Sequence, residues 1–212
     1  MLYLCLSAQG VENALLQLGD YKYAEWRSDL IGSDIPQLTE VLKNKNHNFI
    51  VTCRPGVFTE DYDIKMLYTA ALSGAEYVDL EIERAENNAH FIKDACIKSK
   101  KCKLIISYHN YDETPDVETL NNIILKCRLY GADIVKIACK ANNKNDCSRI
   151  LSLYQENKDI VAFCMGEFGK ITRVASLYLG AKFTYVASSQ EGNTAPGQLT
   201  LNQTSQILDI LK

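Results

Sequence analysis

The chain has 212 residues, of which 47% are hydrophobic and 23% are charged. A chain of this size can bury a complete hydrophobic core as a single domain. The formal net charge is −3, from 23 basic and 26 acidic residues, which argues against bulk electrostatic binding to nucleic acid or to an anionic membrane. Any anionic ligand is therefore expected to be small and to occupy a local basic pocket.

The eight cysteines form no C-x-x-C pair, and several fall inside predicted strands. We therefore expect them to be reduced. Three scattered histidines without metal-ligand spacing predict no structural zinc site. The first residues, MLYLCLSAQ, are apolar, but they lack a basic segment and are too short to span a membrane. This argues against export or membrane insertion and predicts a cytoplasmic protein.

Short apolar runs recur along the whole chain and predict strands. Their starts are 21 to 31 residues apart, and each interval has room for a strand, a crossover helix and two short loops. The pattern therefore predicts successive βα units. The runs are LYLCLS from residue 2, YAEWRSD from 23, FIVTCRP from 49, YVDLEI from 77, KLIISYH from 103, IVKIAC from 134, VAFCMG from 161 and FTYVAS from 183.

The intervals between these runs have helical patterns, most clearly over residues 114–131. Thr114 can cap the helix, Pro115 suits its first turn, and Gly131 can end it. The apolar residues between them fall at helical spacing. A Gly-Ala pair stands before the fourth, sixth and eighth predicted strands, which forms a weak internal repeat with one glycine C-cap in each unit.

Eight strands alternating with helices favour a closed (β/α)₈ TIM barrel over an open doubly wound sheet. The turn after the first strand, SAQGVEN, lacks the G-x-G-x-x-G spacing of a dinucleotide site. Neither a low-complexity tract nor a Pro/Gly-rich linker interrupts the pattern. We therefore predict one (β/α)₈ barrel domain over residues 1–212.

Polar residues collect in the later half of the predicted strands or just beyond them. In a TIM barrel, catalytic groups gather at this end of the strands. Charges that point outward would press against the helix layer, whereas inward charges near the barrel mouth can pair with one another and with a polar ligand. A structural ion-pair network at the mouth is the alternative interpretation. The candidates are Ser7, Glu25, Arg27, Asp29, Arg54, Asp79, Glu81, His109, Lys136 and Ser188.

Lys136 lies in the middle of an apolar, β-branched run, where an ammonium group is costly unless something uses it. Pointed inward, it would lie near His109 at the end of the neighbouring strand. A lysine held among apolar groups and near other cations loses its proton readily and can form a Schiff base with a carbonyl. A nearby imidazole can then move protons on the adjacent carbons. The alternatives are a surface lysine and a structural histidine.

Seven motifs, in order along the chain, resemble the type I 3-dehydroquinate dehydratases of the shikimate pathway. The resemblance implies a carbon–oxygen lyase that removes water from 3-dehydroquinate to give 3-dehydroshikimate, with no metal or organic cofactor. It covers essentially the whole chain. It begins at Ser7 and rests on EWRSD (25–29), CRP (53–55), VDLE (78–81), SYHN (107–110), DIVKIA (133–138), a Met-Gly-x-x-Gly-x-x-Thr-Arg spacing (165–173) and TAPGQ (194–198).

The resemblance also implies roles for individual residues. Lys136 would form the imine with the substrate ketone, and His109 would be the general acid/base. Arg173 would bind the carboxylate, for which a bidentate guanidinium is suited. The remaining residues implied to contact the substrate are Ser7, Glu25, Arg27, Arg54, and Thr194 and Gln198 of a closing loop over residues 190–198.

One departure from the family pattern affects the histidine. Well-known members have a glutamate four residues after the third-strand arginine as its partner, and Phe58 stands at that position here. Glu60, Glu81 or no carboxylate remain as options. The resemblance also leaves open a homodimer and a fusion to, or joint action with, shikimate dehydrogenase.

Two other functions remain compatible with the residues. Another Schiff-base barrel, of the aldolase or transaldolase type, would share Lys136 but would often need a sugar-phosphate site, for which the glycines of residues 163–170 are candidates. A barrel without catalytic activity, binding a small anion or a protein, is the second alternative. Arg173 and the charged cluster of residues 25–29 favour a polyol that carries a carboxylate.

Overall fold

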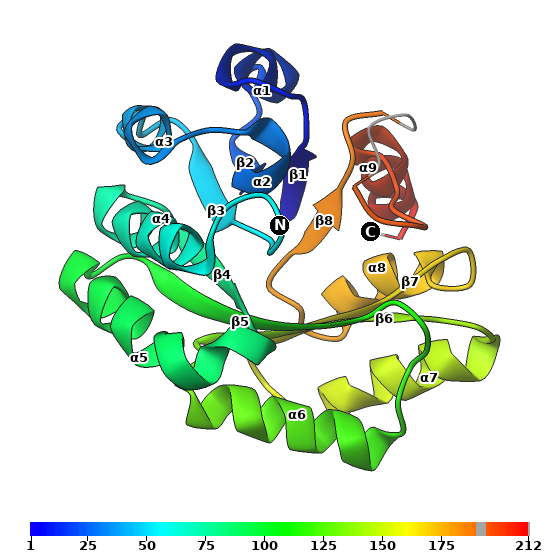
Figure 1. The fold of residues 1–212 in the computed structure, drawn as a ribbon. Coiled ribbons are helices and arrows are strands. Elements are labelled where there is room, and N and C mark those ends of the chain that lie inside the picture. Colours follow the sequence, from blue (N-terminus) through cyan, green and yellow to red (C-terminus); the bar gives the residue numbers. More distant parts are fainter. Residues whose placement is uncertain (190–193, 212) are drawn as a thin grey trace.

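The computed structural model describes residues 1–189 and 194–211. In this part of the chain all eight predicted strands are present, and Figure 1 shows the helices arranged around them. The prediction of a (β/α)₈ barrel is confirmed. The strands are Leu2–Leu6 (β1), Tyr23–Arg27 (β2), Asn48–Thr52 (β3), Tyr77–Glu81 (β4), Lys103–Asn110 (β5), Ile134–Lys140 (β6), Ile160–Met165 (β7) and Thr184–Val186 (β8).

Helices occupy every interval between strands, and one follows the last strand. The second interval holds a single-turn helix before the longer one. The α-helices are Val11–Leu18 (α1), Ser28–Ile31 (α2), Ile35–Leu42 (α3), Glu60–Ser73 (α4), Ile82–Ser99 (α5), Val117–Leu129 (α6), Lys144–Ser152 (α7), Lys170–Tyr178 (α8) and Leu201–Ile210 (α9), with a 3₁₀ turn at Leu153–Gln155 (η1).

All strand pairs are parallel, and the hydrogen-bonded order runs β7-β6-β5-β4-β3-β2-β1-β8. Strands β7 and β8 therefore face each other across the seam of a nearly closed ring. The register aligns Ser107 of β5 with Lys136 of β6, and Glu81 of β4 with the same Ser107. Because parallel strands bring their carboxyl ends to one edge, the polar strand ends meet at one mouth of the barrel.

Two apolar cores follow from the alternation of side chains along the strands. The larger core fills the space between the strands and the helix layer and includes Trp26 and Phe49. The smaller core lies inside the barrel and includes Tyr3, Tyr77 and Phe183. Residues two positions apart on a strand share a face, so the interior core continues directly into the polar side chains at the mouth.

The helix over residues 114–131 is present, but its predicted cap is wrong. Asp116 caps α6 by accepting a hydrogen bond from the Thr119 backbone N–H. The Thr114 hydroxyl instead donates to the Lys140 carbonyl at 2.7 Å, which ties the loop to the end of β6. The prediction about the Gly-Ala pairs is confirmed in geometry, because their glycines, at positions 74, 131 and 180, have positive φ.

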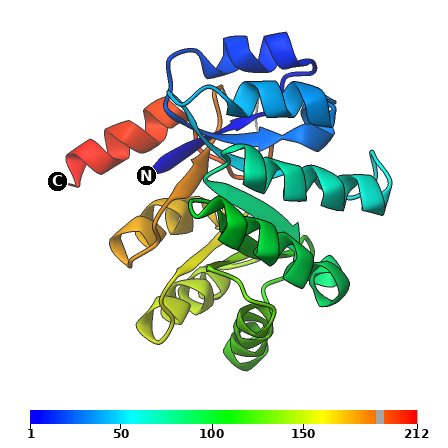
Figure 2. The same cartoon turned by 90° about the vertical axis from the view of Figure 1, so that its left-hand side faces the viewer.

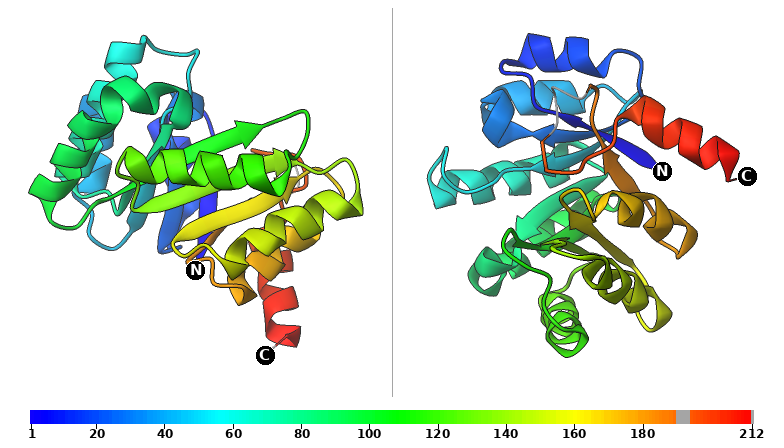
Figure 3. Two further views of the ribbon diagram at one scale, coloured as in Figure 1. Left: turned by 90° about the horizontal axis from the view of Figure 1, so that it is seen from below. Right: turned by 90° about the vertical axis from the view of Figure 1, so that its right-hand side faces the viewer.

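Helix α9 lies on the same side of the barrel as the N-terminus, and Figures 2 and 3 show its far end pointing away from the other helices. All eight cysteines are free and buried. Among the helices of the described residues, none is both long and apolar enough to cross a membrane.

Candidate active site

A cavity opens at the carboxyl ends of the strands. It brings together most of the residues that the sequence predicted for a site. Two of them, Lys136 and His109, come from the adjacent strands β6 and β5. Its lining residues are Cys5, Glu25, Arg27, Arg54, His109, Tyr111, Lys136, Ala138, Phe163, Met165, Arg173, Tyr185, Thr194, Ala195 and Gln198.

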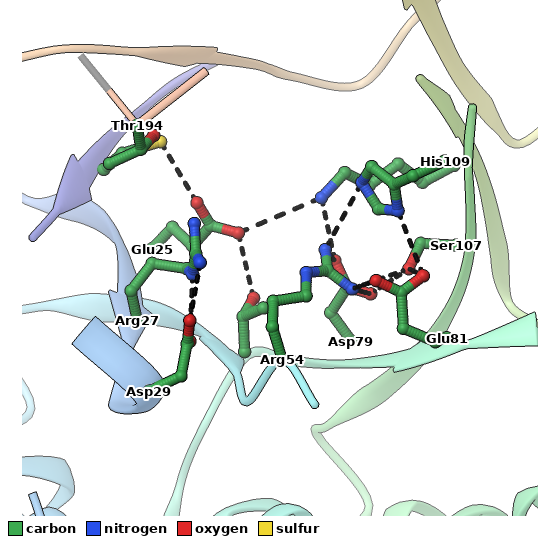
Figure 4. A network of polar contacts seen from close by, with 12 residues as sticks. Glu25, Arg27, Asp29, Arg54, Asp79, Glu81, Ser107, His109 and Thr194 are labelled. Atoms are coloured by element: carbon green, nitrogen blue, oxygen red, sulfur yellow. Dashed lines mark hydrogen bonds and ion pairs between the residues drawn. The ribbon is translucent and has the colours of Figure 1, made fainter. Parts of the chain in front are cut away.

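Arg54 follows β3 and is the centre of a polar network at the cavity wall. It donates to Glu81 at 2.6 Å and to both carboxylate oxygens of Asp79 at 3.1 and 3.4 Å. It also donates to the Ser107 hydroxyl at 3.1 Å. Figure 4 shows its guanidinium between these two carboxylates and His109. Burial lowers the pKa of Arg54, but the carboxylates outweigh this effect and the pKa is raised.

Asp79 is the most deeply buried carboxylate of this network, and it accepts from three side chains. Lys136 Nζ donates to it at 2.9 Å and the Ser107 hydroxyl at 2.5 Å, in addition to Arg54. Burial raises the pKa of Asp79, yet Arg54 and Lys136 hold it well below its ordinary value. Asp79 is therefore ionised throughout the neutral range.

The surroundings of Lys136 differ from the expected apolar and cationic setting. Its Nζ lies 2.9 Å from an Asp79 oxygen and 3.9 Å from a Glu25 oxygen. The aromatic ring of Tyr185 covers it, with 4.3 Å between Nζ and the ring centroid. Lys136 is only 4% exposed, so the predicted inward direction is correct and the alternative of a surface lysine is wrong. The apolar run around Lys136 did not predict these two contacts, because Glu25 lies on β2 and Asp79 on β4.

His109 has a carboxylate partner, and it is Glu81. The His109 Nδ1 lies 3.0 Å from Glu81 Oε2, and Nε2 lies 3.5 Å from an Arg54 nitrogen. Burial and Arg54 lower the pKa of His109, against the opposing effect of Glu81. The ring is therefore neutral at pH 7, and this pairing assigns the proton to Nδ1 and leaves Nε2 as a base.

The other two options for the histidine partner, Glu60 and no carboxylate at all, are wrong. Glu60 lies in the first turn of α4, where its Oε1 accepts from Asn88 at 3.3 Å. Phe58 packs against Tyr62, with 5.2 Å between the ring centroids. The carboxylate therefore comes from the end of β4 and not from the loop after β3.

Glu25 connects β2 to the loop near the C-terminus. It accepts from the Thr52 hydroxyl at 2.9 Å and from the Cys5 thiol at 3.1 Å. Gln198 Nε2 donates to the same thiol at 3.0 Å, and the Gln198 carbonyl accepts from the Thr194 hydroxyl at 3.1 Å. Burial raises the pKa of Glu25, but Lys136 and two arginines outweigh it and lower the pKa. The chain of contacts thus ends on an ionised carboxylate.

Arg27 and Asp29 form a bidentate pair at the edge of the cavity, with 3.0 Å and 2.6 Å between their atoms. The strand ends at Arg27, so Asp29 reaches it from the first turn of α2. Ser7 was expected to contact the substrate, but it does not line the cavity, and its backbone N–H donates to Gln17. Ser188 does not line the cavity either, and its hydroxyl accepts a hydrogen bond from the Gln17 side chain at 2.8 Å.

Arg173 reaches the cavity from helix α8. It is 2% exposed, and its guanidinium carbon lies 4.4 Å from the centroid of the Phe163 ring. Its Nε and one terminal nitrogen have no hydrogen-bond partner among the residues described. Burial lowers the pKa of Arg173 to about 10. A buried guanidinium without a carboxylate is costly, and the cavity can relieve this cost by holding an anion.

Two glycines allow this arrangement through close approach of backbones. A Cβ at Gly169 would lie 2.5 Å from the Cys164 carbonyl carbon, so only glycine lets α8 start against β7. Gly197 has φ of 73°, and a Cβ there would collide with the carbonyl of Gly166. The Gly166 N–H also donates to the Pro196 carbonyl at 3.0 Å. These contacts hold the TAPGQ segment over the cavity.

The loop over residues 190–198 was expected to close over a ligand. Residues 190–193 lie outside the described residues. Thr194 and Gln198 both line the cavity, and Gln198 is 5% exposed. Helix α9 begins only at Leu201, after a capping box at Thr200, so Thr194 and Gln198 belong to the segment before the helix.

Sequence reasoning missed several lining residues. Tyr111 lies just beyond β5, carries no charge and gave no signal of a site. The others had one available signal, since strand alternation places them on the inward face with the interior core; they are Cys5, Phe163, Met165 and Tyr185.

A family model described as type I 3-dehydroquinase matches residues 3–212. The chain belongs to this family. The 3-dehydroquinate dehydratase of Desulfotalea psychrophila is 33% identical to it, over 84% of this chain and 82% of the relative. That of Pyrococcus abyssi is 38% identical, over 81% of this chain and 80% of the relative.

A solved structure supports the same fold. The type I 3-dehydroquinate dehydratase of Clostridium difficile, with covalently modified comenic acid, superposes with a TM-score of 0.87 at 21% identity, covering 99% of this chain and 91% of that one. The resemblance inferred from the seven motifs is therefore confirmed at the level of family and fold. The homodimer and the link to shikimate dehydrogenase stay predictions.

Proposed function

We propose that this member of the type I 3-dehydroquinase family removes water from 3-dehydroquinate, giving 3-dehydroshikimate, through a Schiff base on Lys136. The observation that carries the proposal is the placing of three groups in one cavity: the amine of Lys136, the neutral imidazole of His109 and the unpaired guanidinium of Arg173. A ketone that also bears a carboxylate matches the amine and the guanidinium together. The names of the two curated relatives agree with this substrate.

Binding would begin with the substrate carboxylate on Arg173. The Nε and terminal nitrogen that lack partners are donors on one side of the guanidinium, which suits two parallel hydrogen bonds to a carboxylate. The hydroxyl groups of the substrate would contact Glu25, Arg27 and Arg54, which also line the cavity. Because the ion pairs of these residues fix their positions, the ketone would be held against Lys136.

Imine formation would begin when Lys136 passes a proton to His109 and attacks the ketone carbon. The same proton would then return to the carbinolamine hydroxyl, which leaves as water, and the iminium group that remains carries one positive charge. Asp79 and Glu25 already surround this position at 2.9 and 3.9 Å from Nζ. They therefore stabilise the cation by fixed charges that need no rearrangement. The contact of these two carboxylates with Lys136 thus has a use in this step.

Elimination would follow on the carbons next to the iminium. His109 Nε2 takes a proton from the adjacent carbon, and the electron pair moves into the iminium to give an enamine. The hydroxyl on the next carbon then leaves as water with a proton from His109. Hydrolysis of the imine releases the conjugated enone and the free lysine.

Glu81 would support His109 in both directions of proton transfer. Its carboxylate accepts from Nδ1 at 3.0 Å and so directs Nε2 toward the cavity. When the ring takes a proton, the same carboxylate stabilises the imidazolium. Arg54 limits this effect, because it also binds Glu81 at 2.6 Å. The ring therefore gains and loses its proton without remaining charged.

Ultraviolet absorbance of the conjugated enone after addition of 3-dehydroquinate tests the proposal. We expect turnover by the wild-type protein. Arg173→Met should raise KM by about 10- to 100-fold, the effect of losing hydrogen bonds to a charged partner. It should not lower the melting temperature, because the guanidinium has two unpaired buried nitrogens. Arg128→Met, at an exposed position in the last turn of α6, is the control for removal of an arginine.

Absence of enone formation by the folded wild-type protein would contradict the proposed function. Turnover with an unchanged KM in Arg173→Met would contradict only the role of Arg173. The two outcomes are therefore separate.

A further inference from the structure

We infer that Tyr185 is a further substrate-binding residue, whose hydroxyl donates a hydrogen bond to an oxygen of the bound substrate. This inference rests on the proposed function and adds to it a polar contact that the family resemblance did not assign. The contact would come from β8, on the wall of the cavity next to the imine-forming lysine.

Tyr185 occupies a fixed position on the inward face of β8. Its backbone pairs with Tyr3 of β1, and its ring packs edge-on against Phe183 with 5.7 Å between centroids. The opposite contact is with Lys136, whose Nζ lies 4.3 Å from the ring centroid. The ring thus forms one wall of the space that a ketone must enter to reach the amine.

The hydroxyl of Tyr185 is buried and has no hydrogen-bond partner within residues 1–189 and 194–211. Burying a hydroxyl without a partner is unfavourable, and most buried polar groups are paired. The side chain is only 3% exposed. A phenylalanine would give the same aromatic packing without this cost, so packing alone does not account for the hydroxyl.

Other buried groups in the described part of the chain also lack a partner, and their positions separate two cases. Ser28 Oγ and Thr184 Oγ1 belong to residues that do not line the cavity. The remaining unpaired atoms are the two nitrogens of Arg173 and the hydroxyl of Tyr185, and both residues line it. Arg173 already has a proposed ligand group. The hydroxyl of Tyr185 is thus the donor in the cavity that still needs an acceptor.

Neighbouring carboxylates do not take this role. Glu25 accepts from Thr52 and Cys5, and Asp79 accepts from Arg54, Lys136 and Ser107. Burial, followed by these two carboxylates, raises the pKa of Tyr185 well above its ordinary value. The phenol therefore keeps its proton and is a donor at any working pH. A hydroxyl or carboxylate oxygen of the substrate is the matching acceptor.

The experiment compares Tyr185→Phe with Thr184→Val, its neighbour on β8. Each substitution removes one unpaired buried hydroxyl, so neither should lower the melting temperature. Only Tyr185→Phe should weaken the substrate contact, and we expect its KM to rise by roughly 3- to 30-fold. Reduction by borohydride in the presence of saturating substrate should still link the substrate to Lys136, because imine formation does not need the phenol.

Turnover by the wild-type protein tests the proposed function, and the ratio between variants tests Tyr185. An unchanged KM in Tyr185→Phe would overturn the inference, and so would an equal rise in Thr184→Val. A fall of several degrees in the melting temperature of Tyr185→Phe would also overturn it, since that result requires a partner for the hydroxyl inside the protein.

Discussion

The interior of the barrel has two halves that are built from the same strands and differ in chemistry. Near the amino ends of the strands, Tyr3, Tyr77 and Phe183 pack against one another, with 5.0 to 6.3 Å between their ring centroids. Asp79 lies two residues after Tyr77 on β4, and at this level the inward side chain belongs to a network of ion pairs. The floor is held by packing and the mouth by paired charges.

This comparison explains why the charges at the mouth are tolerated. The floor closes the barrel from below, so water reaches the mouth from one side only. In such surroundings an unpaired charge is costly and a paired one is fixed in position. Within the described residues, the carboxylates and cations of the mouth pair with one another, apart from Arg173, where two nitrogens have no partner. The floor thus supplies stability and the mouth supplies chemistry, and the following substitutions test this division.

Lys136→Ala should have the largest effect. Removal of a covalent nucleophile costs on the order of 10⁶-fold in turnover, and no second lysine lines the cavity among the residues that the structure describes. Lys140, which is exposed at the end of the same strand, provides the control in Lys140→Ala. Borohydride reduction with substrate, followed by mass spectrometry, should place the adduct on Lys136 in the wild-type protein. An adduct on another lysine would contradict the covalent mechanism.

Phe183→Ala should act on stability. Its ring is fully buried and contacts Tyr3, Tyr77 and Tyr185, so the cavity left behind should cost about 3–5 kcal/mol in the free energy of unfolding. Urea denaturation measures this loss, and Phe168→Ala, at a site 48% exposed, should cost much less. If Phe183→Ala left stability unchanged, the floor would not hold the barrel.

Glu81→Gln should lower kcat by about 10- to 100-fold, because a hydrogen bond between the imidazole and a carboxylate is replaced by a neutral one. Its KM should change less, since substrate affinity rests mainly on Arg173. Glu60→Gln is the matched control, as Glu60 was the other candidate partner and contacts Asn88 instead. If kcat were the same in the two variants, Glu81 would not support His109 in catalysis.

The acid limb of the pH profile should be the smallest effect. The pKa of His109 is lowered by burial first and by Arg54 second, so the ring stays neutral below the ordinary imidazole value of about 6.5. The value of kcat/KM should therefore fall only at a pH lower than this. Glu81 opposes the shift, so Glu81→Gln should move the limb further toward acid. If kcat/KM already fell above pH 6.5 on acidification, the assignment of a neutral His109 ring at pH 7 would be contradicted.

The extent to which sequence predicts this protein differs between fold and site. The eight apolar runs located every strand, because burial on both faces leaves a continuous pattern in the chain. The cost of a charge pressed against the helix layer predicted that Lys136 points inward. The sequence could not separate Ser7 from Cys5, which share a face by parity, since only the end of β1 at Leu6 decides which of them remains in the barrel.

Partners across strands were decided by tertiary structure alone. The sequence left Glu60, Glu81 or no carboxylate beside His109, and the register of β4 against β5 places Glu81 there. It also suggested apolar surroundings for Lys136, although Asp79 and Glu25 come from strands far away in the chain. The physical reason is that a strand's own pattern determines the face of each side chain, whereas distances between side chains depend on the stagger of neighbouring strands and the closure of the barrel.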